Sequence, residues 1–465
     1  MWNFNEFKGN LAVIDNKGNK LTYKELDIIG SEAFSGIIGK NLIFCLASNT
    51  IGSLIGYTGL VNSRQVPLML DANIEINQLK RLIEVYKPSY IWMPVDKVKS
   101  FKEEKIIIMK YDYCLIRFKR GMNNNLHNEL GLLLPTSGST GSPKLVRQSY
   151  KNIYSNMKSI AQYLKIDIED RPITTLPMSY TYGLSIINSH LFVGATILLT
   201  DNTIFQREFW EFFKIEKATS MGGVPYTYEM LDKLRFWNME LPFLRTMTQA
   251  GGKLQPKLHR KFAEFSSHNN IEFVVMYGQT EATARMSYLP VENTIDKCGS
   301  VGIAIPGGEF LLLDIDGKVV SEDNKVGELI YKGDNVTLGY ATCIEDLEKE
   351  DENKGVLYTG DMAMRDRDGF YYIVGRKKRF LKVYGNRVNL DELEVMLKEN
   401  FSNGEFACTG EDDSVDIFTT LRGNDSHIIE KVVTITGLSL RAFKINTISS
   451  IPKNQSGKIM YKELG

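Results

Sequence analysis

The chain has 465 residues, 43% of them hydrophobic, which is enough for a large core and for roughly two to four domains or subdomains. Its 56 Lys and Arg residues equal its 56 Asp and Glu residues, so no basic field marks it for nucleic acid or for an anionic membrane surface. We therefore expect small-molecule partners and no nucleic acid.

The cysteines and the N-terminal segment indicate the compartment. Five cysteines, an odd number, lie far apart and form no C-x-x-C, which argues against a disulfide framework or a structural zinc site and favours a reducing compartment. The opening segment MWNFNEFKGNLAV lacks a basic stretch followed by an apolar one, and no apolar run reaches the length of about 18 residues that a membrane span needs. We expect a cytoplasmic protein with no membrane span.

Short apolar runs alternate with segments of helical character in the first part of the chain. The runs NLIFCLA (41–47) and QVPLML (65–70) flank residues 48–63, which are predicted to form a helix capped by Ser48 or Asn49. The same rhythm recurs at SYIWMPV (89–95), LGLLLP (130–135), ATILLT (195–200), ATSMGGV (218–224) and IEFVVMYG (271–278). This alternation predicts an α/β fold with doubly wound parallel sheets.

The pattern changes near residue 300. Short alternating runs separated by Gly and Asp turns, such as GELIYKGDNVTLGY, predict a β-rich, mostly antiparallel subdomain. From about Arg379 a small α+β domain is expected, in which Asn389 caps a helix with Glu392 as its capping-box partner. The apolar face of that helix comprises Leu390, Leu393 and Leu397.

One loop is distinguished by its composition. Residues 136–142, TSGSTGS, hold five hydroxyl residues and two glycines between the apolar run GLLLP and the predicted strand KLVRQS. A flexible surface linker has this composition, but exposed amides and hydroxyls beside Lys144 also suit phosphate oxygens. The Walker loop, G-x-x-x-x-G-K-S/T, does not fit, because Pro143 has no N–H to offer and Leu145 cannot bind magnesium.

The stretch TSGSTGSPK (136–144) matches in full the phosphate loop T-S-G-S/T-T-G-x-P-K of the adenylate-forming enzymes. The chain thus resembles that superfamily, which includes acyl-CoA synthetases, peptide-synthetase adenylation domains and firefly luciferase. Further family motifs occur in the expected order, at LTYKEL (21–26), YGQTE (277–281), YTGD (358–361), GRKKRFLKVYGNRVNLDELE (375–394) and NQSGKI (454–459).

The resemblance implies an AMP-binding adenylation core over residues 1–377 and a small, mobile catalytic lid over residues 378–465. It implies that a small carboxylic acid and ATP, with Mg²⁺, give an acyl-adenylate and pyrophosphate, and that the acyl group then passes to the thiol of CoA. The alternative acceptor is a carrier-protein phosphopantetheine or another non-CoA nucleophile. A nucleotide-binding protein without turnover and a luciferase-like, oxygen-using enzyme are further alternatives.

By resemblance, several residues would bind the phosphates of ATP. The β- and γ-phosphates would be held by Thr136, Ser137, Gly138, Ser139, Thr140, Gly141 and Lys144. Thr280 would bond the α-phosphate and Glu281 would bind Mg²⁺, because a carboxylate that attacks an anionic phosphate needs its charge neutralised. Their place after the run IEFVVM favours the carboxyl end of a strand, where open α/β sheets bind ligands.

The nucleoside would be held by further residues that the resemblance identifies. Tyr277 would stack on adenine, and a tyrosine of the core is the structural alternative. The loop AGG (250–252), with Gly251 and Gly252, would lie on the other face of adenine, and Gly278 and Gln279 would also bind the nucleotide. Asp361 and Arg376 would bind the ribose hydroxyls, although a TGD segment is also a common turn. Arg387 would reach the phosphates in one arrangement of the domains.

Lys458, in the motif SGK, would catalyse the first half-reaction by placing an ammonium between the carboxylate and the α-phosphate. Because the thiol must later reach the same carbonyl, the small domain would have to rotate, and the resemblance places the hinge at Lys378. For Lys377, Lys378 and Arg379 the structural alternative is a solvated basic face.

The acid substrate is the least defined part of the prediction. The stretch LPMSYTYGLS places Tyr180 where many acyl-CoA synthetases have histidine, and Tyr180, Tyr182 and Gly183 are expected at the acyl pocket. Amino-acid adenylation domains usually carry an aspartate in this region, and none occurs between Leu176 and Asn188. An α-amino acid is therefore disfavoured.

Overall fold

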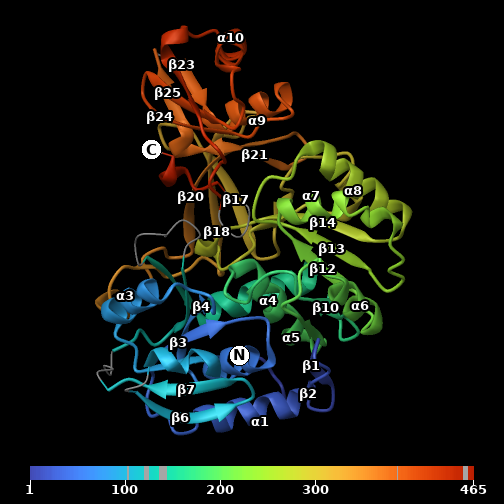
Figure 1. The fold of residues 1–465 in the computed structure, drawn as a ribbon, viewed down its shortest axis with the longest axis vertical. Coiled ribbons are helices and arrows are strands. Elements are labelled where there is room, and N and C mark those ends of the chain that lie inside the picture. The colour runs from blue at the N-terminus through green and yellow to red at the C-terminus, as the bar shows by residue number, and fades with distance from the viewer. Residues whose placement is uncertain (102–103, 120–124, 136–143, 385, 454–458, 465) are drawn as a thin grey trace. The chain divides into compact units, whose positions relative to one another are not determined.

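The computed structural model describes residues 1–101, 104–119, 125–135, 144–384, 386–453 and 459–464. The chain divides into two compact units (Figure 1), which are Met1–Glu309 with Tyr331–Leu357, the large unit, and Phe310–Ile330 with Tyr358–Gly465, the small unit. The domain boundary predicted between residues 377 and 378 stays a prediction.

The first sheet of the large unit has eight strands. Their order is β19 (Gly339–Ala341), β9 (Leu145–Ser149), β8 (Leu130–Pro135), β4 (Val66–Asp71), β3 (Leu42–Ala47), β5 (Tyr90–Pro94), β7 (Tyr113–Arg117) and β6 (Lys105–Lys110). The centre, from β8 to β5, is parallel as predicted. The prediction of parallel strands does not extend to the edges, where β9 pairs antiparallel with β8 and β19, and β7 pairs antiparallel with β5 and β6.

The second sheet has nine strands. Their order is β16 (Ile303–Ala304), β15 (Ser287–Tyr288), β14 (Glu272–Tyr277), β13 (Thr246–Gln249), β12 (Ser220–Gly223), β10 (Pro172–Ile173), β11 (Ile197–Leu199), β1 (Leu11–Asp15) and β2 (Lys20–Thr22). All pairs from β14 to β1 are parallel. The expected doubly wound α/β fold is therefore confirmed, with two sheets.

Helices cover both faces of these sheets. One core joins residues of both sheets to α1 (Tyr23–Phe34), α2 (Ile51–Asn62), α4 (Tyr150–Tyr163) and α5 (Thr181–Val193). The other helices of the large unit are α3 (Ile76–Tyr86), α6 (Arg207–Ile215), α7 (Pro225–Lys233) and α8 (Pro256–His268). Figure 1 shows α7 and α8 on one side of β12, β13 and β14. None of the helices in the described ranges combines the length and apolarity that a membrane crossing needs.

The cap of α2 lies one or two residues beyond the predicted position. The hydroxyl of Thr50 accepts from the N–H of Ser53, so Thr50 is the N-cap. Asn49 instead holds a loop of the second sheet, because its side chain donates to the Leu176 carbonyl at 3.2 Å and accepts from the Met178 N–H at 3.1 Å.

The β-rich region forms a four-stranded sheet in the order β17 (Gly308–Leu313), β18 (Gly327–Gly333), β20 (Val356–Arg365) and β21 (Tyr371–Arg376). After it come the hairpin β22 (Phe380–Val383) and β23 (Asn386–Asn389), then α9 (Leu390–Asn400), β24 (Phe406–Glu411), β25 (Ser414–Thr419), α10 (Asp425–Thr436) and β26 (Phe443–Thr447). Most strand pairs here are antiparallel, as expected, and β25 with β26 is a parallel exception.

Asn389 is confirmed as the N-cap of α9, whereas the capping-box role of Glu392 stays a prediction. The side chain of Asn389 accepts from the N–H groups of Asp391 and Glu392, and it donates to the Val374 carbonyl at 2.7 Å. The three predicted leucines of this helix are buried in the core of the small unit. A sequence-encoded cap and an apolar face thus fix the helix against the strands around it.

Candidate active site

Three neighbouring strands of the second sheet end at the same edge. The parallel register places Gly223 of β12 level with Gln249 of β13, and Gln249 level with Val275 of β14. The segments that follow these strands begin at Val224, Ala250 and Gly278, respectively. The sheet therefore brings the predicted adenine-site residues Gly251, Gly252, Tyr277, Gly278 and Gln279 and the predicted catalytic residues Thr280 and Glu281 to one edge.

Two glycines at this edge are required by close contacts. A Cβ on Gly278 would lie 1.9 Å from the Ala284 carbonyl oxygen, so only glycine allows the loop after β14 to fold back on itself. Gly251 has φ +84°, and a Cβ there would lie 2.7 Å from the hydroxyl of Tyr180. The predicted acyl-pocket residue Tyr180 thus stands directly against the loop after β13.

The loop that carries Thr280 and Glu281 contains a strained turn. Thr283 has φ +64° and ψ −58°, and the N–H of Ala284 donates to the Ala282 carbonyl at 2.7 Å. These angles define the γ-turn with positive φ, which residues other than glycine rarely adopt. Such backbone strain persists only where the surrounding structure enforces it. The Thr283 hydroxyl donates to the Asn335 carbonyl at 2.7 Å, which is one of the contacts that enforce it here.

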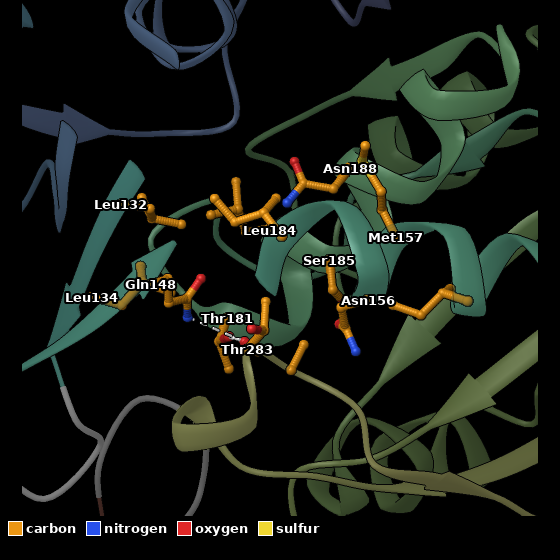
Figure 2. A pocket seen from close by; sticks show the side chains of 13 residues that line it. Leu132, Leu134, Gln148, Asn156, Met157, Thr181, Leu184, Ser185, Asn188 and Thr283 are labelled. Carbon is orange, nitrogen blue, oxygen red and sulfur yellow. Dashed lines mark hydrogen bonds between the residues drawn. The ribbon is translucent and has the colours of Figure 1, made fainter. Parts of the chain in front are cut away.

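The carbonyl of Thr283 is also held. It accepts from Gln148 Nε2 at 3.3 Å and from the hydroxyl of Thr181 in α5. Figure 2 shows these three side chains beside a small pocket that lies between β8, β9, α4 and α5. Strand β9 and helix α5 thus fix the position of the 280–284 turn from two sides.

Lys144 and Glu281 meet across Tyr340. The Tyr340 hydroxyl donates to Glu281 Oε1 at 2.8 Å. The Lys144 ammonium lies over the Tyr340 ring, 3.4 Å from its centroid. Burial and the neighbouring Glu281 carboxylate raise the pKa of Tyr340 well above its usual range, so the phenol stays protonated and remains a donor. The structure thus brings the end of the predicted phosphate loop to the predicted magnesium ligand.

A buried arginine holds Tyr340 in place. Strand β19 pairs with β9 so that Tyr340 faces Val146. Arg147 Nε donates to the Tyr340 carbonyl at 3.1 Å, and Arg147 Nη2 donates to Glu352 Oε2 at 2.6 Å. Its side chain is fully buried. We did not predict Tyr340 or Arg147 from the sequence, although an arginine inside the apolar run KLVRQS was a signal for a buried ion pair.

The predicted acyl-pocket residues begin helix α5. Tyr180 is its N-cap, and the buried Tyr182 pairs its hydroxyl with Thr248 Oγ1 of β13 at 2.8 Å. Gly183 packs on the preceding loop, since a Cβ there would lie 2.4 Å from the Pro177 carbonyl oxygen. These residues therefore lie at the start of α5, where Tyr182 contacts a strand whose end forms part of the site.

In the small unit, the two predicted ribose ligands are brought together. Asp361 of β20 and Arg376 of β21 are cross-strand partners, and Arg376 Nε lies 2.8 Å from Asp361 Oδ1. The Asp361 side chain is 3% exposed and that of Arg376 is 47% exposed. A guanidinium that contacts a buried carboxylate in this way holds the carboxylate in one orientation.

The predicted hinge lies in a short 3-10 segment, Lys377–Arg379, between β21 and β22. Lys378 is exposed, whereas Lys377 binds Glu328 at 2.6 Å and Arg379 binds Glu394 at 2.6 Å. Arg379 is largely buried and also pairs with Asp391, so the alternative of a solvated basic face is wrong for this residue.

Some predicted residues have no described side chain. Thr136, Ser137, Gly138, Ser139, Thr140, Gly141 and Lys458 lie outside the described residues. Arg387 belongs to β23 and faces Lys382 of β22, and its side chain also lies outside what is described. Within the described part of the chain, no three His, Cys, Asp or Glu side chains form a metal cluster. Mg²⁺ is commonly bound by one or two carboxylates together with substrate phosphates, so a cluster is not needed and a single carboxylate such as that of Glu281 fits this role.

A sequence model of the family described as AMP-binding enzyme matches residues 2–341. Similar sequences include the probable CoA ligase CCL5 of Humulus lupulus, 24% identical over 91% of this chain and 80% of its own length. The oxalate–CoA ligase of Arabidopsis thaliana is 29% identical over 70% of this chain and 65% of its own. The long-chain-fatty-acid–CoA ligase of Escherichia coli O157:H7 is 28% identical over 72% and 61%, so the chain spans less than two thirds of these last two.

Solved structures share the fold across almost the whole chain. ATP-bound MatB from Rhodopseudomonas palustris superposes with a TM-score of 0.78 at 20% identity, covering 98% of this chain and 95% of that one. O-succinylbenzoate CoA synthetase (MenE) from Bacillus subtilis, in complex with ATP and magnesium ion, gives 0.77 at 20% identity, covering 98% and 96%. The fold expected from the resemblance is therefore confirmed.

Proposed function

We propose that this chain, which belongs to the AMP-binding enzyme family, is an ATP-dependent ligase that joins a carboxylic acid to the thiol of CoA. The observation that carries the proposal is the array of Lys144, Tyr340 and Glu281 at the edge where β13 and β14 end. A cation and a carboxylate that both contact one tyrosine can take opposite roles on one polyphosphate, since the cation binds phosphate oxygens and the carboxylate binds their metal ion.

The first half-reaction joins the acid to the nucleotide. A carboxylate oxygen of the acid attacks the α-phosphorus of ATP, the bond from that phosphorus to the bridging oxygen breaks, and pyrophosphate leaves. Mg²⁺, when bound, neutralises charge on the phosphates. Thr280 would donate to the α-phosphate, Lys144 would neutralise the leaving phosphates, and Tyr340 would keep the Glu281 carboxylate in the orientation that binds the metal.

The second half-reaction transfers the acyl group. The thiol sulfur attacks the acyl carbonyl carbon, the bond to the AMP oxygen breaks, and the thiol proton is lost to solvent. Lys458 would serve the first step and leave before the second, and we include in the proposal a rotation of the small unit about Lys378 between the two steps. Asp361, oriented by Arg376, would accept hydrogen bonds from the ribose hydroxyls in both steps.

The acceptor and the compartment are finer points of the proposal. The names of the similar sequences are those of CoA ligases, which supports CoA over a carrier-protein phosphopantetheine. A cytoplasmic location, proposed from the cysteine pattern, is tested by fractionating cells that produce the protein.

The test of the function is carboxylate-dependent exchange of pyrophosphate into ATP, measured over fatty, aryl, hydroxy, amino and dicarboxylic acids. We expect exchange with at least one acid class and formation of its CoA thioester when CoA is added. Exchange followed by transfer only to a phosphopantetheinylated carrier protein would reject CoA as the acceptor. ATP binding without exchange for any acid would favour a nucleotide-binding protein without turnover.

A further inference from the structure

A second pocket of the large unit lies between strands β10, β12 and β13 and helix α5. Its sheet wall is made by small residues, because Ser220 pairs with Thr246 and Gly222 pairs with Thr248 across β12 and β13. Alternate residues of a strand lie on the same face of the sheet. These four residues therefore form one patch of small side chains on that face. A Cβ on Gly222 would lie 2.8 Å from Ile186 Cδ1, so only glycine at this position allows Ile186 of α5 to pack this close to the sheet.

The pocket adjoins the site through Tyr182. The Tyr182 hydroxyl bonds to Thr248 in the pocket wall, and its ring makes an edge contact with Tyr180, at a centroid distance of 6.4 Å. Thr248 precedes Gly251 by three residues, which is about 10 Å along a strand. The two tyrosines therefore link the loop after β13, which Tyr180 contacts, to this pocket, whose wall Tyr182 contacts.

Arg285 lines the pocket as a buried cation without a counter-charge. The residue is 2% exposed. Its Nη1 lies 3.1 Å from the Tyr163 hydroxyl and 3.2 Å from Met276 Sδ, and its guanidinium lies over the Tyr182 ring at 5.1 Å. Its Nε has no hydrogen-bond partner, and no carboxylate of the described residues forms an ion pair with it. Burying an unpaired charge is costly unless a partner arrives.

The other ionisable groups of the pocket cannot supply that partner. Asp170 is already paired with another arginine, since Oδ1 accepts from Arg245 at 2.7 Å and from the Thr219 hydroxyl at 2.8 Å, and Oδ2 accepts from the Asp167 N–H at 3.0 Å. Burial lowers the pKa of His190 to about 4, so this ring is neutral at physiological pH. Arg285 is left as the free charge of the pocket lining.

We propose that Arg285 binds a second carboxylate of the acid substrate, which is therefore a dicarboxylic acid. Its reacting carboxylate lies at the strand-end site, its carbon chain passes Tyr180 and Tyr182, and its distal carboxylate lies beside Arg285. A carboxylate there accepts from the unpartnered Nε and supplies the missing negative charge. This inference rests on the proposed function, because it specifies the acid that the ligase activates.

The first test needs no variant. Pyrophosphate exchange by the wild-type protein is measured with unbranched diacids of about four to ten carbons, with monoacids of the same lengths, and with the monomethyl esters of the diacids. We expect the best diacid to exceed its ester and its matched monoacid by about 10²-fold in kcat/KM, since a site built around a buried charge rejects an analogue that lacks the partner. Equal or better exchange with the monoacid would overturn the inference while leaving the proposed ligase intact.

The second test changes the arginine. Arg285→Met should lose about 10²-fold with the diacid and keep or gain activity with the monoacid, whereas Arg285→Lys should lose less, because the charge remains. Arg207→Met, on an exposed arginine of α6, is the matched control and should change neither. The inference fails if the diacid-to-monoacid ratio of Arg285→Met equals that of the wild type.

A binding measurement separates the two proposals. Calorimetric titration of each diacid of the series onto the wild type and Arg285→Met, each with AMP present, reports on the arginine without turnover. Loss of diacid binding in the variant supports the inference even where no acid gives exchange, in which case the proposed ligase activity alone fails. If the variant does not fold, the wild-type comparison of diacid, ester and monoacid decides.

Discussion

The hydroxyl of Tyr340 donates a 2.8 Å hydrogen bond to the carboxylate of Glu281, although the two residues are 59 positions apart in the chain. This bond, with Lys144 over the ring of the same tyrosine, makes β19 part of the phosphate end of the site. Tyr340 therefore has a positioning role: it orients the carboxylate that would bind Mg²⁺ and keeps it close to the lysine that would bind phosphate.

Tyr340→Phe should lower pyrophosphate exchange by about tenfold and shift its magnesium dependence to higher concentration, since a hydrogen bond to a charged group is worth about 1.5–3 kcal/mol. Glu281→Gln should weaken the apparent affinities for magnesium and ATP together, and by more than Tyr340→Phe does, because it removes the carboxylate charge itself. Magnesium titrations of the exchange rate measure both. Tyr154→Phe, at a partly exposed position of α4, is the control. An unaltered magnesium dependence in Glu281→Gln would refute the metal-binding role.

Arg147→Met should destabilise the large unit. The change removes a fully buried guanidinium and leaves the Tyr340 and Leu338 carbonyls without this donor, at about 1–3 kcal/mol for each group that stays buried and unsatisfied. Glu352 adds little to the loss, because its side chain is 49% exposed. The free energy of unfolding in urea measures this loss. Arg207→Met removes an exposed pair with Glu211, on a side chain that is 87% exposed, and should change stability far less. Equal effects of the two variants would show that the buried network does not stabilise the fold.

His259 should make stability depend on pH. Its Nε2–H donates to the Thr294 carbonyl at 3.0 Å and its Nδ1 accepts from the Gly299 N–H at 3.3 Å, so the fold holds a neutral ring. Burial lowers the pKa of His259 from 6.5 to about 4. The unfolded chain takes up a proton at higher pH than the folded one. This contribution is therefore complete above pH 6.5 and is lost as the pH falls toward 4.

Between about pH 7.5 and about pH 5, the loss attributable to His259 should be about 2 kcal/mol. Urea unfolding at the two pH values gives the pH-dependent change in the free energy of unfolding for the wild type and for His259→Gln. The difference between these two changes is the contribution of His259. His268→Gln, at an exposed position of the same helix, should retain the wild-type dependence. If His259→Gln also retains it, the folded ring is not held neutral.

Lys378→Pro tests the proposed rotation. Proline fixes φ near −65° and removes an N–H, so it should trap one arrangement of the units. We expect exchange to stay within about tenfold of wild type, while thioester formation falls by far more, as a shift in conformational populations would produce. Lys378→Ala should preserve both reactions, since a hinge depends on the backbone. Equal losses in the two half-reactions of Lys378→Pro would contradict the hinge assignment.

Local patterns predicted the central strands and the capped helix at Asn389, because apolar runs and caps act over a few residues. The placement of Gly251 and Glu281 in loops that start at the same edge followed from neighbouring parallel strands. Contacts that join distant segments were not predictable. Tyr340 reaches Glu281 only because Arg147 fixes β19, and Thr283 adopts its strained turn only because Thr181, Gln148 and Asn335 hold it.

The most direct measurement of the central claim is acid-dependent exchange of pyrophosphate into ATP by the wild type and Lys458→Ala. A ligase that forms an acyl-adenylate gives exchange that requires both the acid and Mg²⁺. Removing the ammonium that would stabilise the transition state should lower this exchange by at least about 10²-fold without loss of folding. Exchange that does not depend on any acid, or near-wild-type exchange in folded Lys458→Ala with the best acid, would contradict the account.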